Sequence, residues 1–239
     1  MEPLDLYLGS EIGQWALEQV PSPLIKQVFT LDNDTCRLAQ GKNITTWQDD
    51  ANRTSCNRST VGFCVHYPKL LEAHVLSQYE RLYNLHPGYL PWGRGYYPVF
   101  WALWEGTPAG ATLHEIVAAL DRGPIVSQVS VPNTEHDTGG SLHRRVRKAE
   151  EQLFLEYWPR VSSCERIPAY PQPEIRGTYH TKKEFFALKN DSSWETMTGS
   201  ELLRLIRCLT FPGYSGLEVV LGSRRFDVRA ELLDESSAG

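Results

Sequence analysis

Asn84 and His86, two residues apart, are the residues whose types and spacing best suit catalysis. Residues two apart on an extended chain project to the same face. An imidazole can take up a proton near neutral pH, and a side-chain amide can donate a hydrogen bond to an oxyanion. Pro87 follows and ends strand pairing, because proline has no N–H to donate. We therefore predict that this pair lies at the carboxyl end of a strand, where open α/β sheets bind ligands.

The elements that must position this pair alternate between strands and helices. Apolar runs such as Val61–Val65 are typical of buried strands. Residues 32–60 are polar, and we expect loops there with one short helix and one short strand. The alternation predicts an α/β fold, with a Rossmann-like, largely parallel sheet flanked by helices. The expected strands are 4–9, 24–31, 61–65, 81–85, 110–116 and 125–131, and the expected helices are 11–19, 98–105 and 141–157.

The amino-acid composition changes after residue 158. Pro159, Pro168, Pro171 and Pro173 crowd together, which is typical of a linker. We place a boundary near residue 165, between a catalytic domain, 1–165, and a small C-terminal α+β region, 166–239. In the second region we predict a helix over 202–207 and a hairpin with strands 217–221 and 225–228, closed by Gly222-Ser223.

Composition and charge exclude several classes of function for this 239-residue chain. Its net charge of −5 argues against a protein that holds nucleic acid through phosphates. The five cysteines are odd in number and form no C-x-x-C, so neither a disulfide framework nor a zinc site is indicated, and no other metal-ligand spacing is visible. No apolar run could span a bilayer, and the first residues do not resemble a signal peptide. We expect a cytoplasmic protein with no membrane contact.

Several blocks of sequence occur in the order found in one known family. They read N-L-H-P-G-Y-L-P at 84–91, R-G at 94–95, G-A-T-L-H at 110–114 and L-D-R-G-P-I at 120–125, with Pro98, Trp101 and Gln128 between or after them. This stretch resembles the formyltetrahydrofolate-dependent formyltransferases. The resemblance implies a catalytic set of Asn84, His86 and Asp121.

The chemistry of formyl transfer explains this set. An amine must be neutral to attack the formyl carbon and must lose a proton as the new bond forms. His86 can take that proton, and a carboxylate beside it, Asp121, would fix the imidazole tautomer and stabilise the imidazolium. The amide of Asn84 can donate to the oxyanion. His114 has no clear role in this scheme, and we expect it to make a structural or supporting hydrogen bond.

The resemblance also implies a donor, N10-formyltetrahydrofolate, and contacts for it. In the family the pterin occupies a pocket of loop backbone, which maps to 63–71 and 116–121. The candidate donor-binding residues are Phe63, Tyr67, Lys69, Leu71, Ile116 and Leu120.

The acceptor distinguishes three branches of the family: methionyl-tRNA, a purine-pathway ribonucleotide amine, and an amino sugar on a nucleotide diphosphate. Residues 89–98, 177–185 and 209–214 look most like the sugar branch. Basic side chains could neutralise a pyrophosphate, and aromatic ones could stack on a base. The candidate acceptor-binding residues are Arg94, Tyr97, Trp101, Lys182, Lys183, Arg204, Arg207, Phe211 and Tyr214. One departure is Gly88, where the family commonly has serine.

We therefore expect transfer of a formyl group to a dTDP- or GDP-linked 4-amino-4,6-dideoxyhexose. Formylation of methionyl-tRNA is an alternative that the negative charge and the short tail disfavour. A non-catalytic protein that binds folate or a nucleotide sugar is a second alternative. Dimers are usual in the sugar branch, so we expect a homodimer, with the terminal hairpin as a candidate contact.

Overall fold

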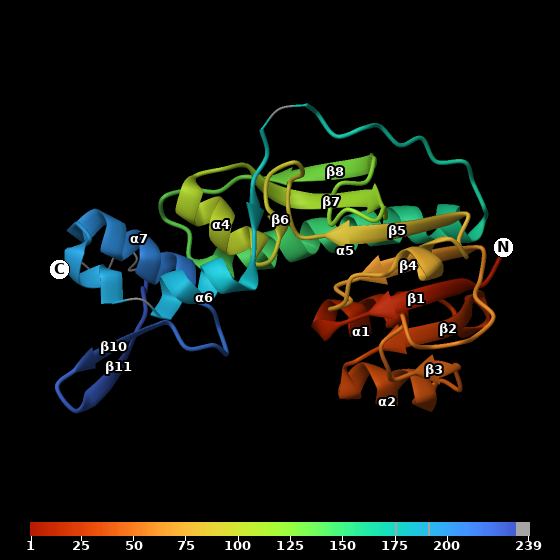
Figure 1. Cartoon of the computed structure of the whole chain (residues 1–239), viewed down its shortest axis with the longest axis horizontal. Coiled ribbons are helices and arrows are strands. Elements are labelled where there is room, and N and C mark those ends of the chain that lie inside the picture. Colours follow the sequence, from red (N-terminus) through yellow and green to blue (C-terminus); the bar gives the residue numbers. More distant parts are fainter. Residues whose placement is uncertain (175, 191, 233–239) are drawn as a thin grey trace.

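The computed structural model describes residues 1–174, 176–190 and 192–232 (Figure 1). Within them a seven-stranded sheet forms the centre, in the order β3-β2-β1-β4-β5-β7-β8. Its first five strands pair in parallel, as expected for the α/β class. The strands are β1 Leu4–Leu8, β2 Ile25–Thr30, β3 Thr46–Trp47, β4 Val61–Val65, β5 Arg81–His86, β7 Ala109–Glu115 and β8 Ile125–Val131.

The last two strands of the sheet depart from the expected alternation. β7 runs antiparallel to β5, and β8 runs antiparallel to β7. The connection 116–124 contains no helix, so β7 and β8 form a hairpin rather than a crossover unit. The sheet is therefore largely parallel, as predicted, but its antiparallel part lies directly beside the Asn84–His86 strand.

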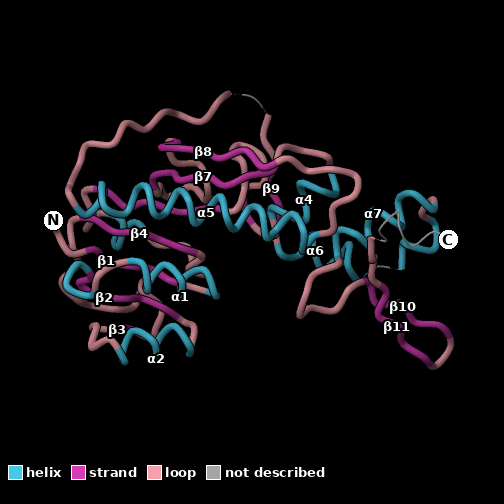
Figure 2. The backbone as a smooth tube through the Cα atoms, turned by 180° about the vertical axis from the view of Figure 1, so that it is seen from behind, coloured by secondary structure: helices cyan, strands magenta, loops and turns pink. Residues whose placement is uncertain are grey.

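Helices cover one face of the sheet, and short segments cover the other. Helices α1, α2 and α5 lie on the same side (Figure 2). Side chains from α1 and α5 join the main core with the strands. The opposite face packs a smaller core under α3 and the nearby loops, centred on Tyr7 and Phe29. The bounds are α1 Ser10–Gln19, α2 Asn33–Gly41, α3 Ala73–Leu76, α4 Pro98–Glu105 and α5 Gly139–Ser162, with a 3-10 turn η1 Ser22–Leu24.

Helix α5 is longer than the sequence pattern indicated, and it contains Pro159. The assignment of Pro159 to a linker was therefore wrong. A proline removes one backbone hydrogen bond inside a helix, to the residue four positions earlier. That residue is Leu155, which is about half exposed. Its carbonyl can therefore be solvated, and the helix continues to Ser162.

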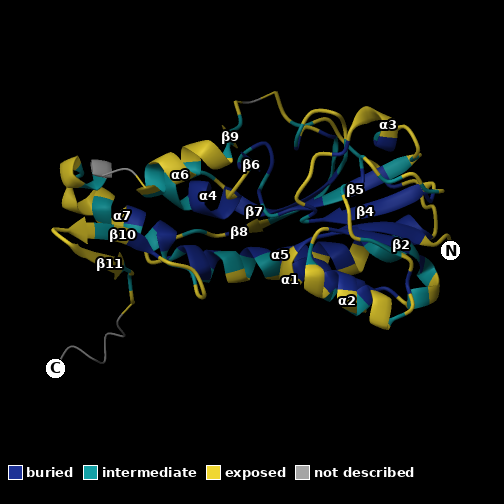
Figure 3. Ribbon diagram, turned by 60° about the horizontal axis from the view of Figure 1, so that its bottom comes forward, coloured by how far each residue is buried: buried dark blue, intermediate teal, exposed yellow. Residues whose placement is uncertain are grey.

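The C-terminal region forms a third core with α4. Phe100 and Trp101 of α4 pack there with Leu205, Cys208 and Leu209 of α7. The terminal hairpin extends beyond this core and is largely exposed (Figure 3). The end of the predicted second region, 233–239, lies outside the described residues. The remaining elements are β6 Arg94–Gly95, β9 Tyr179–His180, α6 Lys182–Asn190, η2 Ser192–Thr196, α7 Gly199–Leu209, β10 Leu217–Leu221 and β11 Arg224–Val228.

The segment before β9, which the sequence marked as a linker, is anchored to the catalytic region. Tyr170 exchanges two backbone hydrogen bonds with Ile125, at the start of β8. The hydroxyl of Thr178 accepts from the Gly93 amide, and β9 pairs in parallel with β6. We call residues 166–174 and 176–181 the strap. The strap begins the predicted second region and contacts the loops that carry Gly93 and Asp121.

Gly123 shows how tightly the connection between β7 and β8 is packed. A Cβ at this position would lie 1.7 Å from the Glu115 carbonyl oxygen. We predict that Gly123→Ala destabilises the protein by about 3 kcal/mol, because the backbone would have to move. Thermal unfolding measures the effect. Gly41→Ala is the control, since its Cβ would meet nothing within 4 Å and should be neutral or slightly stabilising. Equal melting temperatures for the two variants would contradict this packing.

Candidate active site

The structure brings Asn84, His86 and Asp121 together. Asn84 and His86 lie on β5, and Asp121 lies in the connection between β7 and β8. The Nδ1 atom of His86 is 3.8 Å from Oδ1 of Asp121, and both side chains are buried. This separation exceeds a hydrogen bond, so the carboxylate acts on the imidazole through its charge. The expected convergence is present, although without the expected direct hydrogen bond.

The orientation of the His86 ring is set by a backbone carbonyl. Its Nε2 lies 2.8 Å from the Gly93 oxygen. A carbonyl only accepts, so Nε2 carries the proton in the neutral ring, and Nδ1 presents a lone pair toward Asp121. Gly88 makes room for this arrangement, because a Cβ there would lie 2.7 Å from Nε2 of His86. The carbonyl of Gly93, and not Asp121, therefore fixes the tautomer.

Asp121 is held by backbone contacts in an unusual conformation. Its φ of 52° lies in the left-handed region, which is unfavourable for most residues with a side chain. The Gly95 amide donates to Oδ2 at 2.8 Å. The other oxygen, Oδ1, lies 3.7 Å from Nε2 of His114. The carboxylate is thereby fixed between two imidazoles.

His114 is closer to the chemistry than the sequence indicated. It pairs with Asn84 across β5 and β7, and Nδ2 of Asn84 lies 3.0 Å from its Nε2. Its Nδ1 donates to the Glu115 carbonyl at 2.8 Å, so Nε2 accepts from the amide. Burial and the nearby His86 lower the pKa of His114 to about 4. A neutral His114 therefore orients the Asn84 amide, which is the supporting hydrogen bond we expected.

A cavity of about 420 Å³ opens beside these groups. It has a size suited to a small organic ligand. Five of the six predicted donor-binding residues line it: Tyr67, Lys69, Leu71, Ile116 and Leu120. Phe63 does not, because its ring is fully buried in the main core against Phe154 of α5. Consecutive strand residues face opposite sides of the sheet, so Cys64 lines the cavity instead.

Two of the predicted acceptor-binding residues line the same cavity. Lys182 lies with its ammonium group 4.7 Å from the centre of the Tyr96 ring, and Tyr97 stacks on Phe185 at 4.0 Å. Arg94 and Trp101 do not line it. The guanidinium of Arg94 is buried against the strap, and the Trp101 ring is buried in the third core, where it stacks on His180 at 3.8 Å.

The other predicted acceptor-binding residues belong to the surface or to the packing of the C-terminal region. Lys183 is exposed on α6, and Tyr214 is 71 % exposed. Arg204 donates to the Trp104 carbonyl, and Arg207 donates to the Asp137 carbonyl. Phe211 packs against the start of α5. The structure does not bring these five side chains to the cavity.

His66 also lines the cavity, although no sequence pattern pointed to it. It has a φ of 55°, and its Nε2 lies 2.7 Å from the buried carboxylate of Glu150 on α5. Burial opposes the charged imidazole, but Glu150 outweighs it and raises the pKa of His66. The two residues are 84 positions apart, so no local pattern could reveal this pair.

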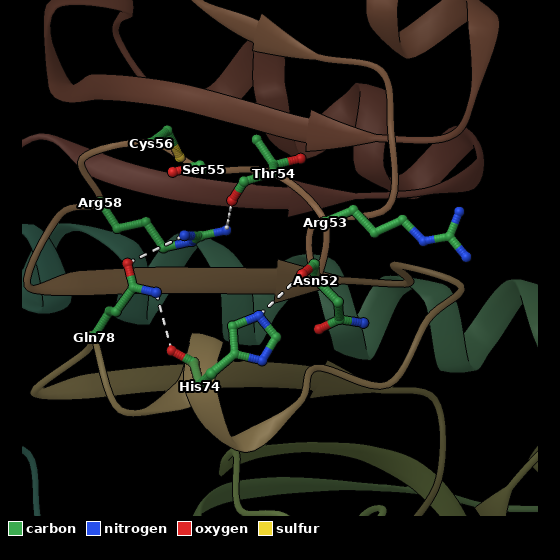
Figure 4. A pocket seen from close by; sticks show the side chains of 8 residues that line it. All are labelled: Asn52, Arg53, Thr54, Ser55, Cys56, Arg58, His74 and Gln78. Atoms are coloured by element: carbon green, nitrogen blue, oxygen red, sulfur yellow. Dashed lines mark hydrogen bonds between the residues drawn. The ribbon is translucent and has the colours of Figure 1, made fainter.

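A second cavity, of about 210 Å³, lies under α3 and shares no residue with the first (Figure 4). Arg58 donates to Gln78 and to the Thr54 carbonyl, and Gln78 donates to the His74 carbonyl. His74 in turn contacts the Asn52 carbonyl. These polar groups bind one another, so the network holds the loop before β4 against α3.

Comparison with known proteins agrees with this geometry. The family model described as formyl transferase matches residues 38–157, half of the chain. The chain is a member of the formyl transferase family. Of the described residues, none form a helix that combines the length and apolar character needed to cross a membrane.

Relatives of this formyl transferase act on amino sugars. The dTDP-4-amino-4,6-dideoxyglucose formyltransferase of Mycobacterium tuberculosis is 31 % identical over 159 residues, which are 66 % of this chain and 67 % of the relative. The formyltransferase PseJ of Anoxybacillus kamchatkensis is 29 % identical, with a TM-score of 0.58 over 73 % of this chain and 96 % of its own. That structure contains a UDP-linked formamido sugar and tetrahydrofolate.

Another solved structure matches the fold of nearly the whole chain. A sugar N-formyltransferase from a Shewanella species has a TM-score of 0.80, and the match covers 98 % of this chain and all of the other. At 17 % identity this likeness concerns the fold alone. The fold therefore extends through the C-terminal region, beyond the segment that the family model matches.

The neutral His114 predicts a dependence of stability on pH. Its pKa is lowered from 6.5 to about 4 in the folded protein, so below pH 6.5 the unfolded chain binds a proton that the folded one does not. Folding stability should therefore fall as the pH drops from 6.5 toward 4. We predict that wild type loses about 2 kcal/mol more than His114→Gln between pH 7 and 4.5.

Urea unfolding at both pH values measures this difference. Glutamine keeps an acceptor for the Asn84 amide but does not titrate. His66 has a raised pKa, so its contribution is present at low pH and is lost as the pH rises through the folded pKa. That contribution is common to both proteins and cancels in the comparison. Parallel pH profiles for the two proteins would contradict a neutral, buried His114.

Proposed function

We propose that this formyl transferase moves a formyl group from N10-formyltetrahydrofolate to the amino group of a nucleotide-linked amino-deoxy sugar. We further propose that the sugar is a dTDP- or GDP-linked 4-amino-4,6-dideoxyhexose. The convergence of Asn84, His86 and Asp121 on one cavity carries this proposal. The named activity of the 31 % identical relative supports the choice of acceptor.

The cavity fits a folate beside the catalytic groups. N10-formyltetrahydrofolate supplies the formyl carbon when it is bound. Tyr67, Leu71, Ile116 and Leu120 provide apolar and aromatic walls for a flat ring system. Residues 66–71 and most of residues 116–121 line the same space, and we propose that their backbone groups bind the pterin.

We propose that His86 is the general base. Its Nε2 is occupied by the Gly93 carbonyl, so Nδ1 is the atom that takes the proton from the attacking amine. The imidazolium that results faces the carboxylate of Asp121 at 3.8 Å. This opposite charge stabilises the protonated ring as the new bond forms.

Asn84 is the proposed donor to the formyl oxygen. One hydrogen of its amide is directed to Nε2 of His114, and the second is free to point into the cavity. A donor fixed in this way needs no reorganisation when negative charge develops, which is why such donors contribute several kcal/mol to catalysis.

The mouth of the cavity supplies contacts for the acceptor. Lys182 can neutralise a phosphate as a point charge, and the exposed edges of Tyr96 and Tyr97 offer ring surface to a sugar or a base. Of the predicted acceptor-binding residues, we keep Lys182 and Tyr97 in this role.

The catalytic assignment predicts large losses of activity without unfolding. His86→Ala should lower kcat on the order of 10²–10⁴-fold, because the base is lost. Asn84→Ala should lower kcat on the order of 10²–10³-fold, because the oxyanion donor is lost. The assay combines enzyme, N10-formyltetrahydrofolate and dTDP-4-amino-4,6-dideoxyglucose, and mass spectrometry reads the gain of one formyl group.

His136→Ala is the matched control, since the His136 side chain is 71 % exposed, and it should retain full activity. Circular dichroism checks the fold of each variant. No formylated product from wild type with any dTDP- or GDP-linked amino sugar would contradict the acceptor. Salt-sensitive formylation of methionyl-tRNA would favour that branch instead, and thermal stabilisation by ligands without turnover would favour a binding protein.

We also propose that the protein works in the cytoplasm as a homodimer. The five cysteines are free thiols, which agrees with a reducing compartment. The hairpin β10–β11 exposes apolar side chains: Val220 is 59 % exposed, Leu221 58 % and Phe226 47 %. Because strand residues alternate between faces, Leu221 and Phe226 lie on one face of the hairpin and Val220 lies on the other. Exposed apolar side chains of this kind are typical of an interface between copies.

The dimer proposal predicts that charge on the hairpin disrupts assembly. Leu221→Glu combined with Phe226→Glu should convert a dimer to a monomer, because carboxylates would be buried at the contact. Light scattering after size exclusion measures the mass. Leu155→Glu, which changes an exposed leucine on α5, should leave the dimer intact. A wild-type protein that is monomeric at micromolar concentration would rule out the dimer.

A further inference from the structure

Gln172, in the strap, bonds to two loops of the active site at once. Its Nε2 donates to the Asp121 carbonyl at 2.7 Å and to the Gly123 carbonyl at 3.0 Å. Its Oε1 accepts from Nε of Arg94 at 3.1 Å and from a second nitrogen of the same guanidinium. One amide thus connects the loop that carries Asp121 with the loop that carries Gly93 and Gly95.

The Asp121 loop needs such support. Its left-handed backbone is unfavourable and persists only where the surroundings hold it. The Gly95 amide binds the Asp121 carboxylate on one side, and Gln172 binds its backbone carbonyl on the other. Together these contacts determine where the carboxylate lies relative to His86.

The guanidinium of Arg94, which Gln172 also contacts, needs a hydrogen-bond partner as well. The guanidinium is buried, and a buried cation requires acceptors for its N–H groups. Gln172 provides one, and the backbone N–H of Arg94 donates to the Thr178 carbonyl, also in the strap. The loop 93–95 is therefore fixed to the strap at both its side chain and its backbone. This loop carries the carbonyl that orients His86 and the amide that holds Asp121.

We propose that Gln172 is a positioning residue for formyl transfer. It acts by holding the loop that carries Asp121 and the loop that carries Arg94 in fixed positions relative to each other. The predicted effect on kcat rests on the proposed function. Gln172 lies outside residues 38–157, the part of the chain that matches the family model. The strap, and not the matched domain, supplies this support.

Two substitutions distinguish the contact of Gln172 with Arg94 from its contacts with the carbonyls of Asp121 and Gly123. Gln172→Glu keeps an acceptor for Arg94 but loses both donors to the carbonyls of Asp121 and Gly123. Gln172→Met has a similar length and loses all of these bonds. We expect kcat to fall roughly 10- to 100-fold in both variants, with KM for either substrate changed less than about 3-fold, since a displaced catalytic group slows the reaction more than binding.

The matched control is Gln78→Met. Gln78 also bridges an arginine and a backbone carbonyl, those of Arg58 and His74, but in the second cavity. This variant loses a comparable network without touching the proposed catalytic groups, so its kcat should equal that of wild type. A loss of kcat in Gln78→Met as large as in Gln172→Met would show a general effect of destabilisation and would overturn the inference.

A readout without turnover tests the geometry directly. The Gly95 amide donates to Asp121, so its hydrogen exchange, measured by NMR, reports whether the carboxylate stays in place. We expect exchange roughly 10-fold faster in Gln172→Met and in Gln172→Glu, and unchanged in Gln78→Met. If wild type forms no product, the proposed function fails, and Gly95 exchange alone decides the positioning role. Wild-type kcat and wild-type Gly95 exchange in both Gln172 variants would overturn it.

Discussion

The antiparallel register between β5 and β7 is the constraint on which the candidate active site depends. It sets Asn84 opposite His114 and His86 opposite Thr112. Side chains alternate along a strand, so a slip of one residue would turn every one of them to the other face. Thr112 also connects β7 to the loop after β5, because its hydroxyl donates to the Gly88 carbonyl and accepts from the Leu90 amide. The pairing that orients the amide thus also supports the loop that orients the imidazole.

The site buries two imidazoles and one carboxylate with little net charge. The carbonyls of Gly93 and Glu115 each take a ring N–H, which leaves one nitrogen of His86 and one of His114 free to accept. With both rings neutral, Asp121 carries the single charge of the cluster, stabilised by the Gly95 amide. A proton that arrives on His86 brings the cluster to neutrality. Because isolated charge is costly in a buried site, this neutral arrangement suits the mechanism proposed above.

Much of the fold could be predicted from the sequence, because apolar runs and glycine or proline boundaries report local structure directly. The strands, the central part of α5 and the terminal hairpin follow from such patterns. The antiparallel turn at β7 did not, since periodicity is the same in either strand direction. The sequence therefore did not show that His114 lies opposite Asn84. Asn84, His86 and Asp121 were recognisable as a set because their flanking blocks occur together.

Residues beyond that set were harder to assign, because burial decides whether an arginine or a tryptophan meets a ligand. Arg94 and Trp101 have the right chemistry for an acceptor, yet both are buried by the C-terminal region. All seven strands of the central sheet lie within residues 4–131, whereas Gln172 comes later in the chain. During synthesis the sheet therefore leaves the ribosome first. Gln172, which binds the Asp121 carbonyl, follows only after α5 is complete. A newly made chain therefore contains all strands of its central sheet before it contains the residue that holds the Asp121 loop.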